Sequence, residues 1–400
     1  MITIDEHRAR ILASVSRSTA TERSVHRSAG FVLADDVVSR WPVPLFDNSA
    51  MDGYAVRRAD AVEGAILRVV ADVPAGCADD PSFGPGEAVR IMTGAPVPAD
   101  ADAIVPLEHT DLGTEVRATP PESITVTVAP KPHAHIRRAG EDAAAGSVAV
   151  RAGTVLGPWQ LSAIASAGHD RIPVVARPRV AVISTGSELV EPSDTPQRGQ
   201  IPESNSVLLA AAIVDAGAEV GWTATVRDDE EALVATLADA DVDAIVLTGG
   251  ASVGSFDVVK AVLNGTGSIE FTTVAMQPGK PQGFGLTEAG VPVFCLPGNP
   301  VSVAVSFEMF VRPALRTMAG HPTIDRPRSV RRAATGWRSR ADRVQVLPVT
   351  VDEHTVRPAA PGGSGSHLVT SLAEATALAV VPAEVIEVFE GDPVTVMELR

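Results

Sequence analysis

Five loop segments carry residue types that could bind an anion or a metal ion, and each follows a stretch that we predict to be a buried strand. They are Ser184–Leu189, Arg227–Glu231, Thr248–Asp257, Gln277–Pro281 and Leu296–Pro300. Glycines in these loops allow the backbone to approach a ligand closely and to aim N–H groups at phosphate or other oxyanions. Two of the loops lead directly into predicted helix N-termini, whose dipoles favour an anion. The loops therefore predict a site for an anionic ligand.

Acidic side chains lie in the same loops, at Glu188, Asp228, Asp229 and Asp257. Carboxylates beside a phosphate would repel it unless a divalent cation lay between them, and Mg²⁺ is commonly shared in this way. Lys280 supplies a fixed cation in the same set of loops. The sequence therefore predicts a Mg²⁺-assisted site for a phosphorylated ligand. The alternative is that the glycines only form tight turns and the acids are solvated, but several such loops at one sheet edge favour the site.

Other motifs give weaker indications. Gly250–Gly254 matches the G-x-S-x-G pattern of a nucleophile elbow, but the next predicted helix begins only at Asp257, whereas an elbow runs directly into its helix. We therefore interpret Ser252 as a hydrogen-bond donor to a ligand rather than as a nucleophile. His133 and His135 lie in a basic loop, which we interpret as surface rather than as a metal site. The sequence contains neither a P-loop lysine motif nor a G-x-G-x-x-G fingerprint.

The elements that position these loops alternate between apolar strands and helices from about Arg177 onward. The first helix of this region is predicted to begin at Ser204 or Asn205 and to end at Gly217. Continuous apolar strands between helices predict a parallel sheet that is covered on both faces. Ligands bind outside the carboxyl ends of the strands in such sheets, where the five loops fall. We therefore assign residues 177–322 to an α/β domain that holds the site.

The rest of the chain is predicted to form three further parts. Residues 44–146 consist of short β-type runs broken by proline and glycine, which indicates a small β-rich module. Residues 323–400 return to β-type runs and are predicted to form a small C-terminal β-barrel. Residues 1–43 together with 147–176 are assigned to an N-terminal helical and linking domain. The predicted fold class is multidomain α/β plus β, with a central parallel sheet.

Composition excludes some classes of partner. The chain has 400 residues with 33 Lys+Arg against 49 Asp+Glu, a net charge of −16. Duplex nucleic acid and anionic membranes need a broad basic face, so neither is an expected partner. Cys77 and Cys295 are the only cysteines, which provides no disulfide framework and no cysteine-based zinc site and fits a reducing compartment. Because no apolar run is long enough to span a bilayer, we predict a cytoplasmic protein.

Several strings resemble the molybdopterin molybdenumtransferases of the MoeA and gephyrin E-domain type. The resemblance rests on Pro44–Val56, Arg90–Val105 and Arg137–Asp142, followed in the family's order by AGTVL, STGSEL, RDD, TGGASVGSFD, QPGKP and LPGNPVSV. It covers nearly the whole chain. It implies a homodimer with a molybdopterin-binding α/β domain, and insertion of molybdate into the dithiolene of adenylylated molybdopterin with Mg²⁺ assistance and release of AMP. The adenylylating enzyme of the same pathway is a further implied partner.

The resemblance also implies roles for individual residues. Those expected to be needed for catalysis are Asp52, Asp142, Glu188, Asp228 and Asp257, of which Glu188, Asp228 and Asp257 would hold the metal. Those expected to line the pterin, phosphate and oxyanion sites are Thr93, Thr185, Gly186, Asn205, Gly249, Gly250, Ser252, Lys280, Gly298, Asn299, Ser302, Ser364 and Ser366. The β-rich module of the partner subunit, which carries Asp52, is expected to complete the cleft.

The chain departs from the family pattern at three positions. Gln277 stands where many members have a lysine, Pro348 stands where many have an arginine, and Glu203 replaces a more usual aspartate. Arg340 or Arg343 could supply the missing arginine. Each lost contact between a cation and an oxyanion removes about 1.5–3 kcal/mol of binding. These departures leave open an auxiliary paralogue or pterin-binding scaffold with weak turnover, and a hydrolase of a related phosphorylated pterin or nucleotide.

Overall fold

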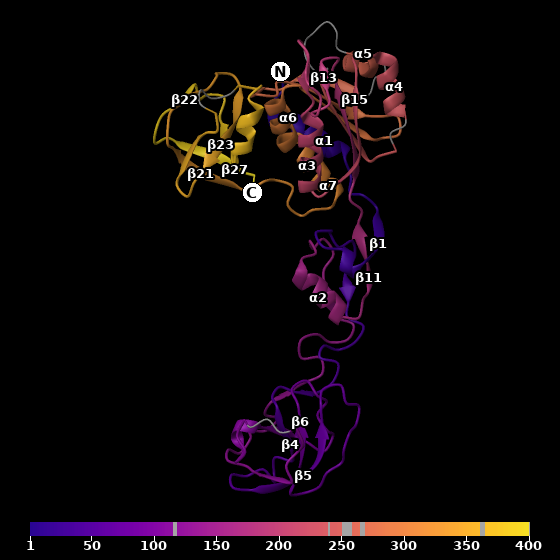
Figure 1. Ribbon diagram of the computed structural model, residues 1–400, viewed down its shortest axis with the longest axis vertical. Helices are drawn as coiled ribbons and strands as arrows, with labels where there is room; N and C mark the ends of the chain where they lie inside the picture. Colours follow the sequence, from indigo (N-terminus) through magenta and orange to yellow (C-terminus); the bar gives the residue numbers. More distant parts are fainter. Residues whose placement is uncertain (115–117, 239–240, 250–257, 265–268, 361–364, 400) are drawn as a thin grey trace.

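The molecule is elongated, with the β-rich module at one end and the α/β sheet and the C-terminal barrel side by side at the other (Figure 1). The computed structural model describes all residues of the chain except 115–117, 239–240, 250–257, 265–268, 361–364 and 400. A narrow connection that contains β1, β11 and α2 lies between the two ends. None of the helices in the described part of the chain is both long and apolar enough to cross a membrane.

The central sheet has six strands in the order β15-β12-β16-β20-β19-β17. Its strands are β12 (Arg179–Thr185), β15 (Glu219–Val226), β16 (Ala244–Thr248), β17 (Ile269–Thr273), β19 (Pro281–Leu286) and β20 (Pro292–Leu296). The first four strands in this order are parallel, which confirms the predicted α/β sheet. Strands β19 and β17 extend it antiparallel at one edge, because a tight turn at Thr287–Gly290 reverses the chain between β19 and β20. The sheet is therefore mixed rather than wholly parallel.

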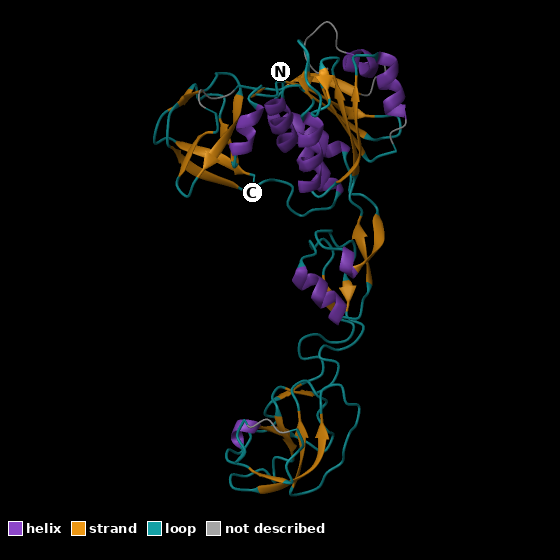
Figure 2. Cartoon of the chain, viewed as in Figure 1, coloured by secondary structure: helices purple, strands orange, loops and turns teal. Residues whose placement is uncertain are grey.

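Helices cover both faces of this sheet (Figure 2). They are α1 (Ile4–Ser14), α3 (Asn205–Asp215), α4 (Glu230–Ala238), α5 (Val258–Asn264), α6 (Pro300–Ser306) and α7 (Arg312–Met318), with a π-helical segment, Phe307–Val311, that joins α6 to α7. Side chains alternate across the strands, as a sheet buried on both faces requires. Val180 and Val182 pack in the core of α3, α6 and α7, whereas Ala181 and Ile183 pack in the core of α4 and α5.

Helix α1 packs with the α/β sheet rather than with the connecting region. Its residues Ile4 and Ile11 lie in the same core as α3 and α7, and Ile2 pairs in parallel with Val274. Thr3 and Glu6 form a capping box at its start. The sequence predicts that this helix belongs with residues 147–176, because an amphipathic pattern does not show which body a helix will cover. The four-part division of the chain stays a prediction.

The C-terminal region forms the predicted barrel. Its strands are β21 (Arg328–Ala333), β23 (Val344–Val351), β24 (Thr355–Pro358), β25 (Ala377–Val381) and β27 (Pro393–Glu398), and β22 (Trp337–Arg338) pairs with β26 (Glu387–Val388) beside them. The order β23-β24-β21-β27-β25 closes because β25 also pairs with β23. Closure removes the free edges that an open sheet would expose.

The β-rich module is a five-stranded sheet in the order β7-β4-β6-β5-β8. These strands are β4 (Gly53–Val56), β5 (Ile66–Val73), β6 (Glu87–Ile91), β7 (Ala103–Pro106) and β8 (Ser123–Thr125). The small pairs are β3 (Asn48–Ser49) with β9 (Ile136–Arg137), β2 (Val37–Val38) with β10 (Val148–Val150), β1 (Ala20–Ser24) with β11 (Arg171–Val175), and β13 (Leu189–Val190) with β14 (Ile201–Pro202). Helix α2 (Pro158–Ser166) accompanies the connection, and short 3-10 helices occupy Val25–Arg27, Leu107–His109 and Val369–Glu374.

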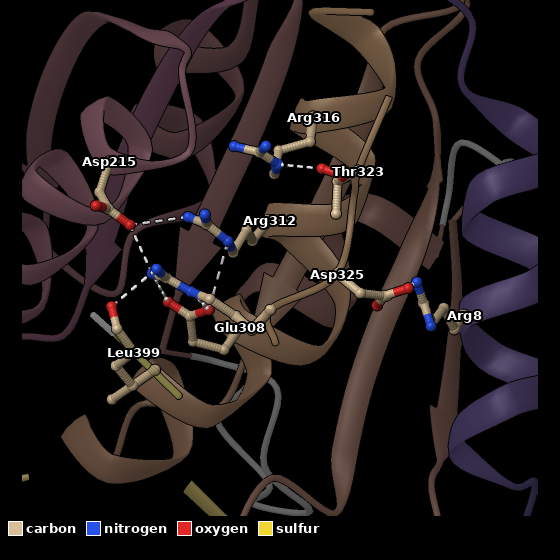
Figure 3. Close-up of polar contacts among 9 residues, drawn as sticks. Arg8, Asp215, Glu308, Arg312, Arg316, Thr323, Asp325 and Leu399 are labelled. Atoms are coloured by element: carbon tan, nitrogen blue, oxygen red, sulfur yellow. Dashed lines mark hydrogen bonds and ion pairs between the residues drawn. The ribbon is translucent and has the colours of Figure 1, made fainter. Parts of the chain in front are cut away.

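An ionic network fixes the segment that leads from α7 to the barrel (Figure 3). The guanidinium of Arg326 contacts both carboxylate oxygens of Glu308 at 3.0 Å and Asp215 at 2.5 Å, and it donates to the carbonyl of Leu399 at 2.8 Å. Arg312 donates to Asp215 at 2.8 Å. The contacts with Glu308 and Asp215 raise the pKa of Arg326 although burial opposes the shift. The network therefore joins α3, the π-helical segment and the C-terminal strand.

Candidate functional site

The α/β sheet and the barrel share a pair of strands, and a cavity opens at this junction. Strand β18 (Met276–Gln277) pairs in parallel with β23, and the N–H of Val344 donates to the carbonyl of Ala275 at 3.0 Å. The cavity has a volume of about 390 Å³. Its lining residues are Thr273, Met276, Gln277, Pro278, Gly279, Lys280, Pro281, Pro297, Gly298, Asn299, Ser302, Arg343 and Ser366. The structure thus brings together two predicted loops and the start of the barrel.

Two cations face this cavity from different bodies. Lys280 comes from the loop between β18 and β19, and Arg343 comes from the residue before β23 in the barrel. Lys280 is exposed and Arg343 is partly buried, and neither has a carboxylate within ion-pair distance in the part of the chain that the structure describes. The chain contains only three lysines, and one of them, Lys280, lines this cavity. Arg340 and Arg343 are both candidates from the sequence, and Arg343 is the one that lines the cavity.

The Lys280 loop is held in shape from behind. Gly279 has φ +93°, and a Cβ at this position would lie 2.9 Å from the hydroxyl of Ser306. The buried amide of Gln282 donates to the carbonyl of Gly279 and to Ser306 Oγ, each at 2.7 Å. Glycine is required at this conformation, and the two hydrogen bonds fix the turn. Gln282 was not predicted as a site residue, and no local pattern indicates its role.

Three of the predicted loops are in direct contact beside the cavity. A Cβ at Gly249, where φ is +95°, would lie 2.3 Å from the carbonyl oxygen of Thr185, and a Cβ at Gly298 would lie 3.4 Å from the Cα of Gly249. The amide of Asn205 donates to Thr248 Oγ1 at 3.0 Å and to the carbonyl of Gly298 at 2.8 Å. Asn205 Oδ1 is buried and has no hydrogen-bond partner among the described residues. Asn205 therefore holds the loops together and keeps an acceptor free.

Glu203 has a supporting position at this edge of the sheet. Its carboxylate is 5 % exposed and accepts hydrogen bonds from Ser184 Oγ and from the N–H of Ser206, each at 2.9 Å, and from Ser206 Oγ. Ser206 lies in the first turn of α3, where a negative charge is favourable. Glu203 therefore fixes the start of the helix that carries Asn205.

Two of the predicted metal ligands lie on neighbouring loops. Ser187 N–H donates to Asp228 Oδ2 at 3.0 Å, and the N–H of Asp228 donates to Ser187 Oγ at 3.2 Å, which ties the loop of Glu188 to that of Asp228. Both carboxylates are exposed. Asp257 lies outside the described residues, as do Gly250, Ser252 and Ser364. Within the described residues no group of three or more His, Cys, Asp or Glu side chains could hold a metal ion, so the predicted ligand set stays a prediction.

Asp52 and Thr93 lie together in the β-rich module. Asp52 Oδ1 accepts from the N–H of Thr93 at 2.6 Å and from its hydroxyl at 2.8 Å. Asp142 is exposed on another loop, where its N–H donates to the carbonyl of Val43 at 2.9 Å. The strands β4 and β6 that flank Asp52 and Thr93 lie at the opposite end of the chain from the cavity (Figure 1). Within one chain Asp52 and Thr93 therefore do not meet Lys280.

Comparison with known proteins accounts for nearly the whole chain. The family described as MoeA N-terminal region (domain I and II) matches residues 2–168, the probable molybdopterin binding domain matches 181–317, and the MoeA C-terminal region (domain IV) matches 330–399. Molybdopterin molybdenumtransferase 2 of Mycobacterium tuberculosis is 42% identical, with 100% of each chain covered. Molybdopterin molybdenumtransferase of Haemophilus influenzae is 34% identical, with 99% of this chain and 98% of the relative covered. A crystal structure of the molybdopterin biosynthesis MoeA protein from Pyrococcus horikosii superimposes with a TM-score of 0.84 at 30% identity, covering 100% of this chain and 99% of that one.

Proposed function

Because the chain belongs to the MoeA family of molybdopterin molybdenumtransferases and acts in a late step of molybdenum cofactor biosynthesis, we propose that it inserts molybdenum into adenylylated molybdopterin. Release of AMP, assisted by Mg²⁺, is part of the proposal. The observation that carries it is the cavity of about 390 Å³ at the junction of the sheet and the barrel, with Lys280 and Arg343 in its wall.

The cavity is proposed as the place where molybdate, a substrate of the reaction, is bound. Lys280 and Arg343 carry two positive charges against the two negative charges of the anion. Hydroxyl groups of Ser302 and Ser366 line the same space and can donate to the remaining oxygens. Each contact with a cation contributes about 1.5–3 kcal/mol. The arrangement supports oxyanion binding although Gln277 and Pro348 replace two expected cations.

The contacting loops beside the cavity are proposed to hold the pterin and its phosphates. Gly249 and Gly298 bring two backbone segments together, and backbone N–H groups in such bends bind phosphate oxygens. The free acceptor of Asn205 fits a ligand with N–H donors, which a pterin ring provides. The loops would therefore hold the pterin and its phosphates next to the oxyanion. Correct placement of the two reactants would supply much of the rate enhancement.

Mg²⁺ is proposed to be held by Asp228 and Glu188 together with Asp257. The donor set fits this ion, because Mg²⁺ prefers carboxylate oxygens and keeps several waters, and the Asp228 and Glu188 carboxylates are exposed. Bound there, the ion would supply Lewis-acid polarisation of the phosphates. The chain's own contribution is the pair of hydrogen bonds between Ser187 and Asp228, which positions the carboxylate.

We propose a homodimer in which the partner subunit's β-rich module completes the cleft. The proposal is supported by the separation of Asp52 and Thr93 from the cavity within one chain. It is also supported by large apolar side chains that are exposed in the connection and in the segment that leads from it into the β-rich module. They are Trp41 at 40%, Leu45 at 56%, Phe46 at 45% and Trp159 at 86% exposure. A second copy of the chain would cover such a surface. A cytoplasmic location and contact with the adenylylating enzyme complete the proposal.

The test is turnover of adenylylated molybdopterin by the purified protein with Mg²⁺ and molybdate, measured as AMP and as molybdenum cofactor. We expect AMP release that requires molybdate and is lost in Asp228→Ala, while Lys131→Ala, an exposed lysine in the β-rich module, keeps it. AMP release without molybdate would instead identify a hydrolase. Pterin binding without turnover would identify a scaffold or an auxiliary paralogue.

A further inference from the structure

The described lining of the cavity at the junction presents charged donors to a ligand and includes no acidic side chain. Of the described residues that line it, the charged ones are Lys280 and Arg343, and both are positive. A lysine ammonium and an arginine guanidinium can only donate hydrogen bonds. The remaining polar lining consists of hydroxyls and amides. Gln277 is a polar lining residue that lies on β18, at the junction itself.

The backbone of Gln277 is held by a neighbouring strand that is itself fixed. It is paired with Gln345 in the short parallel ladder between β18 and β23. Gln345 is 3 % exposed, accepts a hydrogen bond from Trp337 Nε1 at 3.0 Å and donates to the carbonyl of Arg338 at 3.3 Å. Because the neighbouring strand is fixed in this way, the backbone of Gln277 cannot move out of the wall without separating the two bodies.

The oxygen and the NH₂ group of the Gln277 amide have different surroundings. Its Oε1 is withdrawn from solvent and has no hydrogen-bond partner among the described residues, although Gln277 lines the cavity. An unpaired buried acceptor is costly, so a functional reason is expected for it. With the oxygen buried, the NH₂ group is the part of this amide that a ligand can reach. Gln277 then adds a neutral donor to two charged donors.

We propose that Gln277 is a specificity-determining residue that selects tetrahedral dianions without a hydrogen, such as molybdate, over hydrogen phosphate. The inference rests on the proposed function of the cavity and extends it to ligand choice. Molybdate offers acceptors on all its oxygens, so every donor in the wall is satisfied. Hydrogen phosphate has the same charge but carries one O–H, which faces a donor at Gln277 and loses a hydrogen bond. A lysine at this position would add charge and strengthen binding of both anions.

The experiment measures binding of molybdate and of inorganic phosphate by calorimetry, at a pH where phosphate is mostly the hydrogen phosphate dianion. Wild type is compared with Gln277→Met, which removes the donor, and Gln277→Glu, which replaces it with an acceptor. Gln197→Met is the matched control, since Gln197 is exposed on another loop. Thermal unfolding of each variant is recorded to confirm that it is folded.

We expect Gln277→Met to weaken molybdate binding about tenfold and phosphate binding less, because one hydrogen bond to a charged group is lost. Gln277→Glu should lower the ratio of molybdate to phosphate affinity further, since its carboxylate accepts from the O–H of phosphate. An unchanged ratio in both folded variants would overturn the role of Gln277 while leaving the cavity as an oxyanion site. Failure of the wild type to bind either anion would instead overturn the proposed function of the cavity.

Discussion

At the scale of single residues, the cavity depends on two cations that come from different parts of the sequence. Lys280 was expected from its loop, whereas Arg343 was one of two alternatives on a polar segment. Arg343 reaches the cavity wall because β18 pairs with β23. The two strands are about seventy residues apart in the chain, and no local sequence pattern indicates such a pairing. The side chain was therefore visible in the sequence, but its position was not.

Removing the positive charge of Arg343, which the barrel contributes, should weaken oxyanion binding specifically. We expect Arg343→Ala to raise the molybdate concentration for half-maximal AMP release at least about tenfold, because a charge-assisted contact is lost. Arg328→Ala is the matched control, since Arg328 is exposed on β21 of the same barrel and has no ion pair within the described residues. Steady-state kinetics at varied molybdate would measure the change. Equal effects of the two substitutions would contradict the assignment.

The burial of His7 predicts that the protein loses stability in mild acid. His7 is 1 % exposed, its ring packs on the edge of Phe310 at 4.8 Å between centroids, and burial together with Arg10 lowers its pKa to about 4. The folded state holds the neutral ring, so its contribution is complete above pH 6.5, the unfolded value, and falls as the pH drops toward 4. The shift from 6.5 to about 4 corresponds to about 3 kcal/mol.

Urea unfolding at neutral pH and near pH 4.5 would measure this dependence in wild type and in His7→Asn. We expect a smaller loss of unfolding free energy in the variant, because the neutral side chain takes up no proton. His321 has a pKa that is also lowered to about 4, by burial and by Arg316, Arg177 and Arg312, so part of the dependence should remain. An identical pH slope in both proteins would show that His7 is not the titrating group.

At the scale of elements, the sequence predicted the strands and helices better than their directions. Val180–Thr185 and Ala244–Thr248 are runs of apolar residues, and both form central strands. Strand β19 has no clear strand pattern in the sequence, because its glycines interrupt the apolar run. Gly283 is needed there because a Cβ would lie 2.8 Å from Cys295 Cβ and from the ring of Phe271. Such packing between neighbouring strands cannot be predicted from the local sequence.

Helix α3 should depend on the carboxylate that precedes it. We expect Glu203→Ala to lower the free energy of unfolding by about 1–2 kcal/mol, because the first turn of α3 loses an acceptor and the Ser184 hydroxyl is left unpaired. Glu191→Ala is the control, since Glu191 is exposed on the loop between β13 and β14. Chemical denaturation would measure both. Equal stability of the two variants would show that the hydrogen bonds of Glu203 contribute nothing net.

At the scale of the whole molecule, the elongated shape separates two groups of predicted site residues. Asp52 and Thr93 lie beside β4 and β6, which are at one end of the molecule in Figure 1, whereas Lys280 lies between the sheet and the barrel at the other end. The resemblance implies Asp52 and Thr93, whereas Lys280 is also predicted by the composition of its loop. A sequence gives no distances, and the separation of the two groups within one chain supports the shared site that we propose between two chains.

Mixing two inactive variants tests the shared site. If Asp52 of one subunit works with Asp228 of the other, Asp52→Ala and Asp228→Ala homodimers are both inactive. Exchange of subunits would create hybrids with one intact site, and we expect about a quarter of wild-type AMP release after random exchange. Unmixed variants incubated under the same conditions provide the control. Activity that fails to return although exchange is complete would place both residues in one chain's site.

The clamp on Arg326 has a consequence for the shape of the cavity. The segment from α7 is pinned by Glu308, Asp215 and the carbonyl of Leu399 immediately before the first barrel strand begins at Arg328. Barrel residues such as Val346 and Met397 also pack in the core shared with the helices of the sheet. The spacing between Arg343 and Lys280 is therefore fixed by apolar packing as well as by the short ladder between β18 and β23, and the width of the cavity is a property of the whole junction.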